Sequence, residues 1–487
     1  MSKEILSLEP KAVWANFYSL TQVPRPSKHE DKIQAFMVKF GKDLGLETIK
    51  DEAGNVIIKK PATKGMEDRM GVIMQGHLDM VPQKNSDTDH DFEKDPIETF
   101  VDGEWLTANG TTLGADNGMG VAAAMTVLQS TDIAHGPIEA LFTSDEETGM
   151  FGAFGLKAGV LDGDILLNMD SEDEGELYVG CAGGIDANIT FKNKTTDTPK
   201  DTVAFKLSMK GLKGGHSGME IILGRGNSNK LLFRFLKHAA KNFGLRLASV
   251  DGGSLRNAIP RESFAVVVVP KENVDACAAS LKEFEATFKA ELSEVEPDLV
   301  FGAEPCNLPK KVMKGKLQNR LIDAIYACPN GVIRMSNAMP GMVETSINLA
   351  RVYSDENGIL IQALLRSSVN SAKDDLAEMV TSVFTLAGAK VVLEGQYPGW
   401  KPNMDSPILK TMQGVYNKMY GKIPKVMAIH AGLECGLLGS NYPHWDMISF
   451  GPTIRFPHSP DEKVKIDTVT KFWDFTVETL KNIPVKK

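Results

Sequence analysis

The chain has 487 residues, more than one hydrophobic core usually organises, so two or three domains are expected. Its 42% apolar and 24% charged residues are typical of a globular protein, and the net charge of −9 argues against nucleic acid as the main partner. No apolar run approaches the roughly 18 residues of a membrane span, residues 1–4 lack a secretory pattern, and the five cysteines form no disulfide framework, so we expect a cytoplasmic protein without a membrane partner.

The first candidate site follows predicted helices over residues 11–20 and 29–44 and a strand over residues 55–59. An apolar strand over residues 71–77 ends at His77, and Asp79 lies two residues further on. A carboxylate beside a histidine fixes the ring tautomer and raises its basicity, as in the outer shell of many metal sites. His-x-Asp alone is a weak signal, and its position at a strand end strengthens it.

A glycine-rich segment around Asp116 comes next, leading into a predicted buried helix over residues 121–128. Glycines on both sides let the backbone approach a ligand closely. The alternative is a phosphate-binding loop, but its Gly-Lys-Ser/Thr ending is absent, and Asp116 would repel a phosphate and attract a cation.

Two further apolar strands also end in acids. The strand over residues 138–142 precedes Asp145, Glu146 and Glu147, and the strand over residues 164–169 precedes Asp170. Acidic residues in such a position most often belong to a solvated loop. Parallel strands, however, also deliver catalytic groups at their carboxyl ends. A bend would let one glutamate bind a cation while the other acts on a water. The repetition of this placement distinguishes His77, Asp116, Glu147 and Asp170.

The pattern changes near residue 185. Strands and helices recur twice up to about residue 395, which predicts two α+β units side by side, each an antiparallel sheet backed by helices. From residue 396 the α/β character returns. We therefore expect an α/β catalytic domain, built from residues 1–185 and 396–487 around a mixed, mainly parallel sheet flanked by helices. Residues 186–395 would form an inserted α+β lid domain with an internal duplication.

Several polar residues of these later regions are candidates. His216 lies in a glycine-rich turn, and Asn257 and Arg366 lie at strand edges, where either could hold a substrate carboxylate. His458 stands between two prolines on a stiff loop suited to a metal ligand. For each of these four residues, a solvated position on the protein surface is the simpler interpretation. Cys435 is a candidate nucleophile, but a lone cysteine is usually a small buried side chain.

Two histidines and three carboxylates, with one further glutamate, suffice to bind two divalent cations through one shared aspartate. Mixed imidazole and carboxylate ligands favour zinc, and Mn²⁺ or Co²⁺ are alternatives. Paired cations activate water for hydrolysis, and Glu146 would then serve as the general base.

Seven motifs in unbroken order carry a family resemblance over most of the chain. Four of them resemble the co-catalytic zinc peptidases of family M20: Gln75-Gly76-His77-Leu78-Asp79-Met80-Val81, Gly114-Ala115-Asp116-Asn117-Gly118, Asp145-Glu146-Glu147-Thr148-Gly149 and Met169-Asp170-Ser171-Glu172. The other three are similar to the aminoacyl-histidine dipeptidase branch of that family: Gly214-Gly215-His216-Ser217-Gly218, His430-Ala431-Gly432-Leu433-Glu434-Cys435 and Phe456-Pro457-His458-Ser459-Pro460.

The resemblance implies a role for each motif residue. His77 and Asp170 would hold one zinc, Glu147 and His458 the other, and Asp116 would bridge them. Asp79 would orient His77, Glu146 would be the acid/base, and His216 on the lid would stabilise the substrate oxyanion. A cis peptide bond between Asp116 and Asn117 is also implied. The candidate substrate contacts are Asn257, Arg366, His430 and Glu434.

The sequence therefore predicts a cytosolic two-zinc dipeptidase that acts on small peptides of the Xaa-His type, including β-Ala-His. An alternative is a related hydrolase of other small peptides or N-acyl amino acids. A third hypothesis is a catalytically silent metal-binding or scaffold protein. The intact Glu146 counts against this hypothesis. Relatives often pair through the lid, which would give a homodimer, whereas a duplicated lid would supply the second lid surface within one chain.

Overall fold

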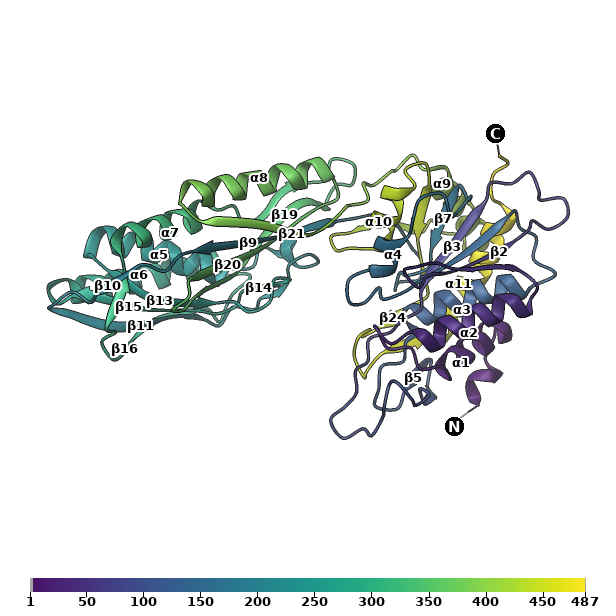
Figure 1. Ribbon diagram of the computed structural model, residues 1–487, viewed down its shortest axis with the longest axis horizontal. Coiled ribbons are helices and arrows are strands. Elements are labelled where there is room, and N and C mark those ends of the chain that lie inside the picture. The colour runs from purple at the N-terminus through teal and green to yellow at the C-terminus, as the bar shows by residue number, and fades with distance from the viewer. Residues whose placement is uncertain (1–2, 487) are drawn as a thin grey trace. The chain divides into compact units, whose positions relative to one another are not determined.

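The structure, a computed structural model, describes residues 3–486. The chain forms two compact units, each shown in Figure 1. The first unit contains Met1–Gly180, Pro402–Ala428 and Leu433–Lys487, and the second contains Cys181–Lys401 and Ile429–Gly432. Within the described residues, no helix is both long and apolar enough to cross a membrane.

The first unit is built around a mixed eight-stranded sheet of order β1-β2-β6-β3-β7-β23-β8-β22. Its strands are β1 (Glu47–Lys50), β2 (Val56–Lys60), β3 (Val72–His77), β6 (Ile138–Thr143), β7 (Ile165–Asn168), β8 (Glu176–Cys181), β22 (Lys425–Ile429) and β23 (Asp446–Ser449). A mixed sheet was predicted. The central strands β6, β3, β7 and β23 pair in parallel, and the pairs β1–β2, β2–β6 and β8–β23 are antiparallel.

The first unit also contains helices, one of which has clear local sequence signals at both ends. They are α1 (Lys11–Thr21), α2 (Asp31–Asp43), α3 (Ala115–Gln129), α4 (Phe151–Gly155), α9 (Pro407–Tyr420), α10 (Glu434–Asn441) and α11 (Ile466–Lys481), with a short η1 (Glu4–Ser7). Helix α9 shows both ends clearly: Ser406 caps its first turn, and Gly421 ends it with a φ of 68°. Helix α3, apolar all round, is buried along nearly its whole length and packs on β3, β6 and α1.

A second, four-stranded sheet in this unit was not predicted. It has the order β24-β25-β5-β4 and consists of β4 (Thr99–Asp102), β5 (Trp105–Ala108), β24 (Ile454–Arg455) and β25 (Lys463–Lys465). Strands of two to four residues are too short to show a repeated alternation of apolar and polar residues. Their pairing joins segments far apart in the chain, such as Val464 opposite Leu106.

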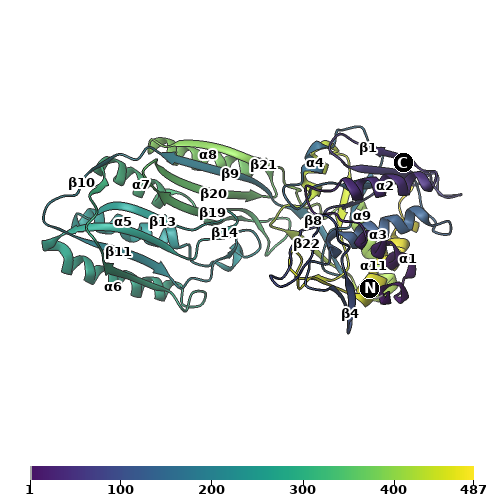
Figure 2. The ribbon, with the colours of Figure 1, turned by 60° about the horizontal axis from the view of Figure 1, so that its bottom comes forward.

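The second unit is an antiparallel sheet with helices packed on it (Figure 2). The sheet has the order β16-β11-β15-β13-β19-β20-β9-β21, with β18 paired to β19. Its strands are β9 (Gly183–Phe191), β11 (Thr202–Lys210), β13 (Arg246–Gly252), β15 (Ser263–Pro270), β16 (Val300–Pro305), β18 (Gly331–Met335), β19 (Val343–Ser354), β20 (Ile359–Ser367) and β21 (Lys390–Tyr397). The helices are α5 (Ser228–Phe243), α6 (Val274–Glu291), α7 (Gly315–Ala327) and α8 (Asn370–Leu386), and their apolar faces share one core with the sheet.

Small elements complete the second unit: the ladders of β10 (Thr195–Asp197) with β17 (Lys311–Met313) and of β12 (Gly215–His216) with β14 (Ala258–Ile259), and the turns η2 (Ile221–Leu223) and η3 (Lys271–Asn273). The prediction of two separate sheets is wrong. The two halves form one sheet because β13 and β19 pair at their edges, through Asp251 opposite Tyr353 and Gly252 opposite Val352. This pairing satisfies backbone groups that two separate sheets would leave exposed.

Candidate metal centre

The parallel strands of the first unit bring the predicted ligands to one edge of its sheet. His77, the last residue of β3, lies opposite Thr143, the last residue of β6. On the other side of β3, Gln75 lies opposite Asn168, the last residue of β7. Asp170, two residues beyond Asn168, therefore comes level with His77, which is two residues beyond Gln75. The strand register alone places these two side chains together.

His77 and two carboxylates form the first ligand group. The Nε2 atom of His77 lies 3.2 Å from Asp116 Oδ1 and 3.3 Å from Asp170 Oδ1. On the other side of the ring, Nδ1 lies 3.3 Å from Asp79 Oδ1. His77 and Asp79 are buried, so this carboxylate fixes the direction in which the ring presents Nε2.

A second ligand group shares Asp116 with the first. The Nε2 atom of His458 lies 3.3 Å from Asp116 Oδ2 and 3.0 Å from Glu147 Oε2. One oxygen of Asp116 thus faces each histidine. The structure brings together all five predicted ligands, although His458 lies more than 300 residues beyond Asp116 in the chain.

The donor set fits two divalent cations. Ligand atoms around a tetrahedral zinc with bonds of about 2.0–2.2 Å are roughly 3.3–3.6 Å apart, close to the spacings around His77 and His458. In addition, Glu147 Oε1 is buried and accepts no hydrogen bond from any described residue. A buried carboxylate oxygen without a donor is costly unless a cation faces it.

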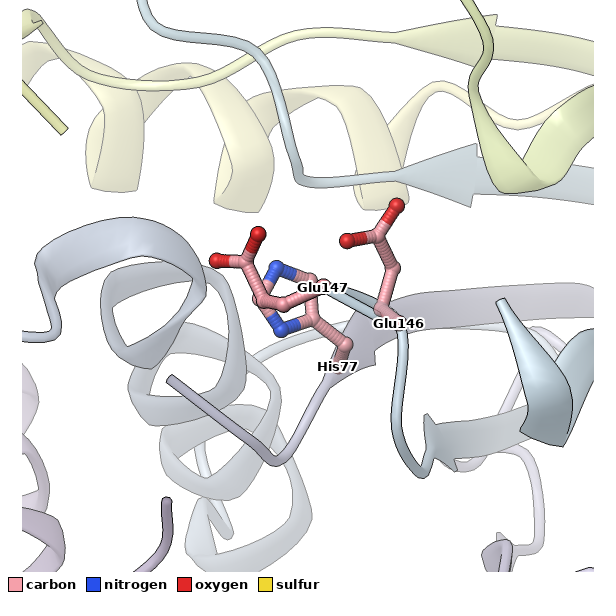
Figure 3. A group of neighbouring side chains, drawn as sticks. All are labelled: His77, Glu146 and Glu147. Atoms are coloured by element: carbon pink, nitrogen blue, oxygen red, sulfur yellow. The ribbon is translucent and has the colours of Figure 1, made fainter. Parts of the chain in front are cut away.

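Glu146 stands beside these two groups. Figure 3 shows its carboxylate, that of Glu147 and the ring of His77 pointing into the same space. Asp79 holds this arrangement, because its Oδ1 accepts the backbone N–H of Glu146 (3.0 Å) and its Oδ2 that of Glu147 (3.2 Å). Glu146 also comes within ligand distance of His77 and Glu147, so its role as base rather than ligand is an inference.

The electrostatics of the centre are those of crowded, buried carboxylates. Burial raises the pKa of Asp170 to about 7. Burial also raises the pKa of Glu146 well above its ordinary value, and neighbouring carboxylates raise it further. The hydrogen bonds of Asp116 and Glu147 raise the pKa of His458 to about 11. Cations between these groups would compensate the acids and leave both imidazoles neutral.

Glycines let the Asp116 loop approach β3. A Cβ on Gly76 would lie 2.2 Å from Asn117 Oδ1, and one on Gly120 would lie 2.6 Å from the Met169 carbonyl oxygen. Asn117 donates a 2.6 Å hydrogen bond to that same carbonyl. The peptide bond between Asp116 and Asn117 is cis, as the resemblance implied.

Two charged residues that the sequence did not single out fix this loop. Glu462 is buried and accepts four backbone N–H groups, with Oε2 bound to Leu113 and Gly114 and Oε1 to Ala115 and Asp116, at 2.8–3.1 Å. Arg25, also buried, donates to the carbonyls of Leu78, Asp79 and Gly114. The one local signal that could have marked Arg25 is its place between Pro24 and Pro26, and nothing in the local sequence distinguishes Glu462 from its exposed neighbour Asp461.

Replacing Glu462 by Gln is expected to lower the free energy of unfolding by about 1–3 kcal/mol and the affinity for zinc by about 10–100-fold. The amide group would face backbone N–H donors and leave two of them without an acceptor. Denaturant unfolding and competitive zinc titration measure the two effects. Asp461→Asn, at an exposed position, is the matched control. Wild-type zinc affinity in Glu462→Gln would show that the loop holds Asp116 without this carboxylate.

The predicted lid residues lie in the second unit. His216, in β12, pairs with Ala258 of β14, and the carbonyl of the exposed Asn257 accepts the N–H of Ser217 at 2.8 Å. The Nδ1 atom of His216 accepts the backbone N–H groups of Gly218 (3.2 Å) and Met219 (3.0 Å). Since burial lowers the pKa of His216, the neutral ring carries its proton on Nε2, which can donate.

Arg366 and His430 lie close to His216 in the same unit. Ser346 of β19 pairs with Arg366 of β20, and its hydroxyl lies 2.7 Å from His430 Nε2. A Cβ on Gly218 would meet the His430 carbonyl at 2.2 Å, so the His216 turn packs on His430. Burial and the charge of Arg366 lower the pKa of His430 to about 3, which keeps this imidazole neutral. Arg366 is buried and donates to Tyr397 Oη at 3.1 Å.

Glu434 is the remaining predicted substrate contact. It belongs to the first unit, opens helix α10 and is fully buried. Its Oε2 accepts hydrogen bonds from Gln75 Nε2 (2.6 Å) and Thr143 Oγ1 (2.7 Å), and Asn168 Nδ2 donates to Gln75 Oε1 (2.5 Å). These contacts tie β3, β6 and β7 together beneath the metal centre, so the substrate contact expected of Glu434 stays a prediction. Cys435, next to it, is also buried.

Comparison with known proteins identifies the family of the chain. Residues 73–482 match the model of the peptidase family M20/M25/M40. The chain is 47% identical to the cytosol non-specific dipeptidase of Escherichia coli K12, over 99% of this chain and 100% of that protein. It is 52% identical to the crystal structure of an aminoacylhistidine dipeptidase from Vibrio alginolyticus, with a TM-score of 0.95 over 100% and 99% of the two chains. An aminopeptidase PepT from Bacillus cereus shares the fold at 17% identity, with a TM-score of 0.61 over 98% and 99%.

Proposed function

The chain belongs to the peptidase family M20/M25/M40, and from this we propose that it is a two-metal dipeptidase that hydrolyses Xaa-His dipeptides, including β-Ala-His. One observation carries the proposal: the two ligand groups share Asp116, and Glu146 stands beside them. The name of the Escherichia coli relative supports a dipeptidase, and the name of the Vibrio alginolyticus relative supports the choice of Xaa-His dipeptides.

In this proposal His77 and Asp170 hold one cation, Glu147 and His458 hold the other, and Asp116 lies between them. Zinc is the proposed metal, because imidazole and carboxylate ligands suit it, with Mn²⁺ or Co²⁺ as alternatives. When bound, the cations supply Lewis acidity, which makes water more acidic and stabilises negative charge on the substrate carbonyl oxygen.

Glu146 performs the proton transfers. Its carboxylate accepts a proton from the attacking water and then gives that proton to the leaving nitrogen of the histidine product. Asp79 supports both steps, because it orients His77 and holds the backbone of Glu146. Burial and the neighbouring carboxylates raise the pKa of Glu146, and cations held by the two ligand groups would lower it again.

The second unit is proposed to act as a lid that supplies substrate contacts. The Nε2–H of His216 is the proposed donor to the carbonyl oxygen of the scissile bond. Asn257, Arg366 and His430 surround it and would bind the rest of the dipeptide, with Arg366 suited to a carboxylate. We also propose a cytoplasmic location, following the name of the Escherichia coli relative. Pairing through the lid into a homodimer stays a prediction of the family resemblance.

The function is tested by metal removal. We expect dialysis against a chelator to abolish release of histidine from β-Ala-His and other Xaa-His dipeptides, and added Zn²⁺ to restore it, because both ligand groups are then refilled. Histidine release is followed by chromatography, with a mock-dialysed sample as the control. Undiminished turnover in protein shown to be metal-free would overturn the proposal.

A broader substrate range is the second candidate, since the name of the Escherichia coli relative describes a non-specific enzyme. The same metal centre would serve other small peptides or N-acyl amino acids, because the proposed lid residues choose the substrate. Measuring kcat/KM for a panel of dipeptides, tripeptides and N-acyl amino acids decides between the Xaa-His dipeptidase and this broader candidate. Higher kcat/KM for acylated or longer substrates would favour this candidate.

A further inference from the structure

One cavity of the second unit is lined by basic residues. It has a volume of about 1020 Å³ and lies between the start of α7, the turn from α8 to β21 and the ends of β9, β19 and β20. Lys192 and Lys194 follow β9, and Lys314 and Lys316 flank the first residue of α7. All of these residues belong to the same unit, so the cavity does not depend on how the two units are placed.

Three further cations complete the lining: Arg320 of α7, Arg351 of β19 and Lys390 of β21. Seven positive charges from four separate parts of the unit therefore surround one cavity. This concentration is unusual in a chain whose net charge is −9. Like charges gathered around a concave surface repel one another and raise the local concentration of anions.

The described residues provide almost no counter-charge. None of the seven cations forms an ion pair with a described carboxylate, although many lysines and arginines elsewhere in the structure do. The one acid in the lining, Asp355, is used within its own turn, where Oδ1 accepts the backbone N–H groups of Asn357 (2.8 Å) and Gly358 (3.0 Å). The cavity thus holds a surplus of unpaired positive charge.

The lining also contains apolar and oriented groups. Phe191 and Ile359 are buried and contribute an apolar floor. The guanidinium of Arg351 lies over the ring of Tyr353, 5.2 Å from its centre, and the buried Nε of Arg351 has no hydrogen-bond partner among the described residues. Such a site suits a ligand that combines several negative charges with a flat or apolar part.

This cavity is distinct from the His216 cluster. Phe191 pairs with Ile359 at one end of the β9–β20 ladder, and Gly183 pairs with Ser367, next to Arg366, at the other end. The eight residue steps along β20 correspond to roughly 27 Å of extended strand. A dipeptide bound near Arg366 would not reach the cavity.

We propose that this basic cavity binds a small organic polyphosphate, of the nucleoside diphosphate or triphosphate class. The phosphate groups would contact the lysines and arginines, and the ring system would lie on the apolar floor beside Tyr353. This site is independent of the peptidase function proposed above.

The test is isothermal titration of the zinc-loaded protein with ATP, pyrophosphate and adenosine at physiological salt. We expect ATP to bind most tightly, pyrophosphate more weakly and adenosine not measurably, with affinity falling as salt is raised. The double variant Lys314→Glu/Lys316→Glu is expected to weaken ATP binding by about tenfold or more, since two direct charge contacts become repulsive. Its peptidase activity should equal that of the wild type, which verifies folding.

The control is Lys200→Glu/Lys282→Glu, which makes the same change in charge at exposed positions of the same unit outside the cavity. Both double variants keep the metal ligands, so any removal of zinc by the phosphates affects them equally. The proposal is overturned if ATP does not bind at physiological salt, or if both double variants weaken binding to the same degree. Equal affinity for ATP and pyrophosphate would show that the ring system of ATP does not contribute to binding.

Discussion

Replacing Glu146 by Gln is expected to lower kcat for Xaa-His dipeptides by about 10²–10⁴-fold while both cations stay bound. Glutamine has the shape of glutamate but cannot accept a proton from water, so the transfer to the leaving nitrogen is lost. The two ligand groups of His77 and His458 do not contain residue 146, so metal content should be unchanged. Elemental analysis and steady-state kinetics of the same preparation measure both quantities.

Asp145→Asn is the matched control for this variant. Asp145 precedes Glu146 and has a φ of 48°, a conformation that asparagine tolerates well, and its side chain accepts a hydrogen bond from Thr148. We expect this control to keep nearly full activity. If Glu146→Gln instead lost a cation, Glu146 would be a ligand, as its closeness to His77 and Glu147 allows. Unchanged turnover with full metal content would remove Glu146 from the mechanism.

Replacing Asp116 by Asn is expected to reduce the bound cations from two to at most one and to abolish most of the activity. One carboxylate oxygen of Asp116 faces His77 and the other faces His458, whereas an asparagine offers one oxygen and one N–H₂ group, which cannot bind a cation. The loss of zinc affinity should exceed the roughly 10–100-fold that removal of an outer-shell partner costs. Zinc titration and elemental analysis give the stoichiometry.

Asp132→Asn provides the control for Asp116, because this exposed aspartate follows the opposite end of α3. The Asp132→Asn variant should bind two cations and hydrolyse Xaa-His dipeptides at the wild-type rate. Two tightly bound cations in Asp116→Asn would mean that the two ligand groups do not share a bridging carboxylate, and the two-metal proposal would then need another connecting residue.

Local sequence patterns were sufficient to predict most strands of the first unit's eight-stranded sheet. The strands ending at His77, before Asp145 and before Asp170 are buried on both faces, so they appear in the sequence as continuous apolar runs. Parallel strands end at one edge, and acids placed just beyond those ends must therefore converge. For this reason the sequence could mark His77, Glu147 and Asp170 as candidate ligands that lie close together, whereas nothing local placed the loop of His458 beside them. The family resemblance added the pairing of ligands with each cation.

Contacts between distant segments could not be predicted in this way. The four-stranded sheet depends on Val464 meeting Leu106, and the joining of the two halves of the second unit depends on a short pairing of β13 with β19. Strands this short, or joined over two residues, carry no periodic signal. The predicted pair of separate sheets was wrong for that reason.

The sequence by itself determined which residues can bind cations and at which strand ends they stand, because side-chain chemistry and strand periodicity are local properties. The tertiary structure decided what holds them: Glu462 binds the backbone of the Asp116 loop from about 350 residues away, and Glu434 lies buried beneath the sheet edge among Gln75 and Thr143. A buried carboxylate acquires its partners only when separate segments pack together, and no local pattern encodes that packing.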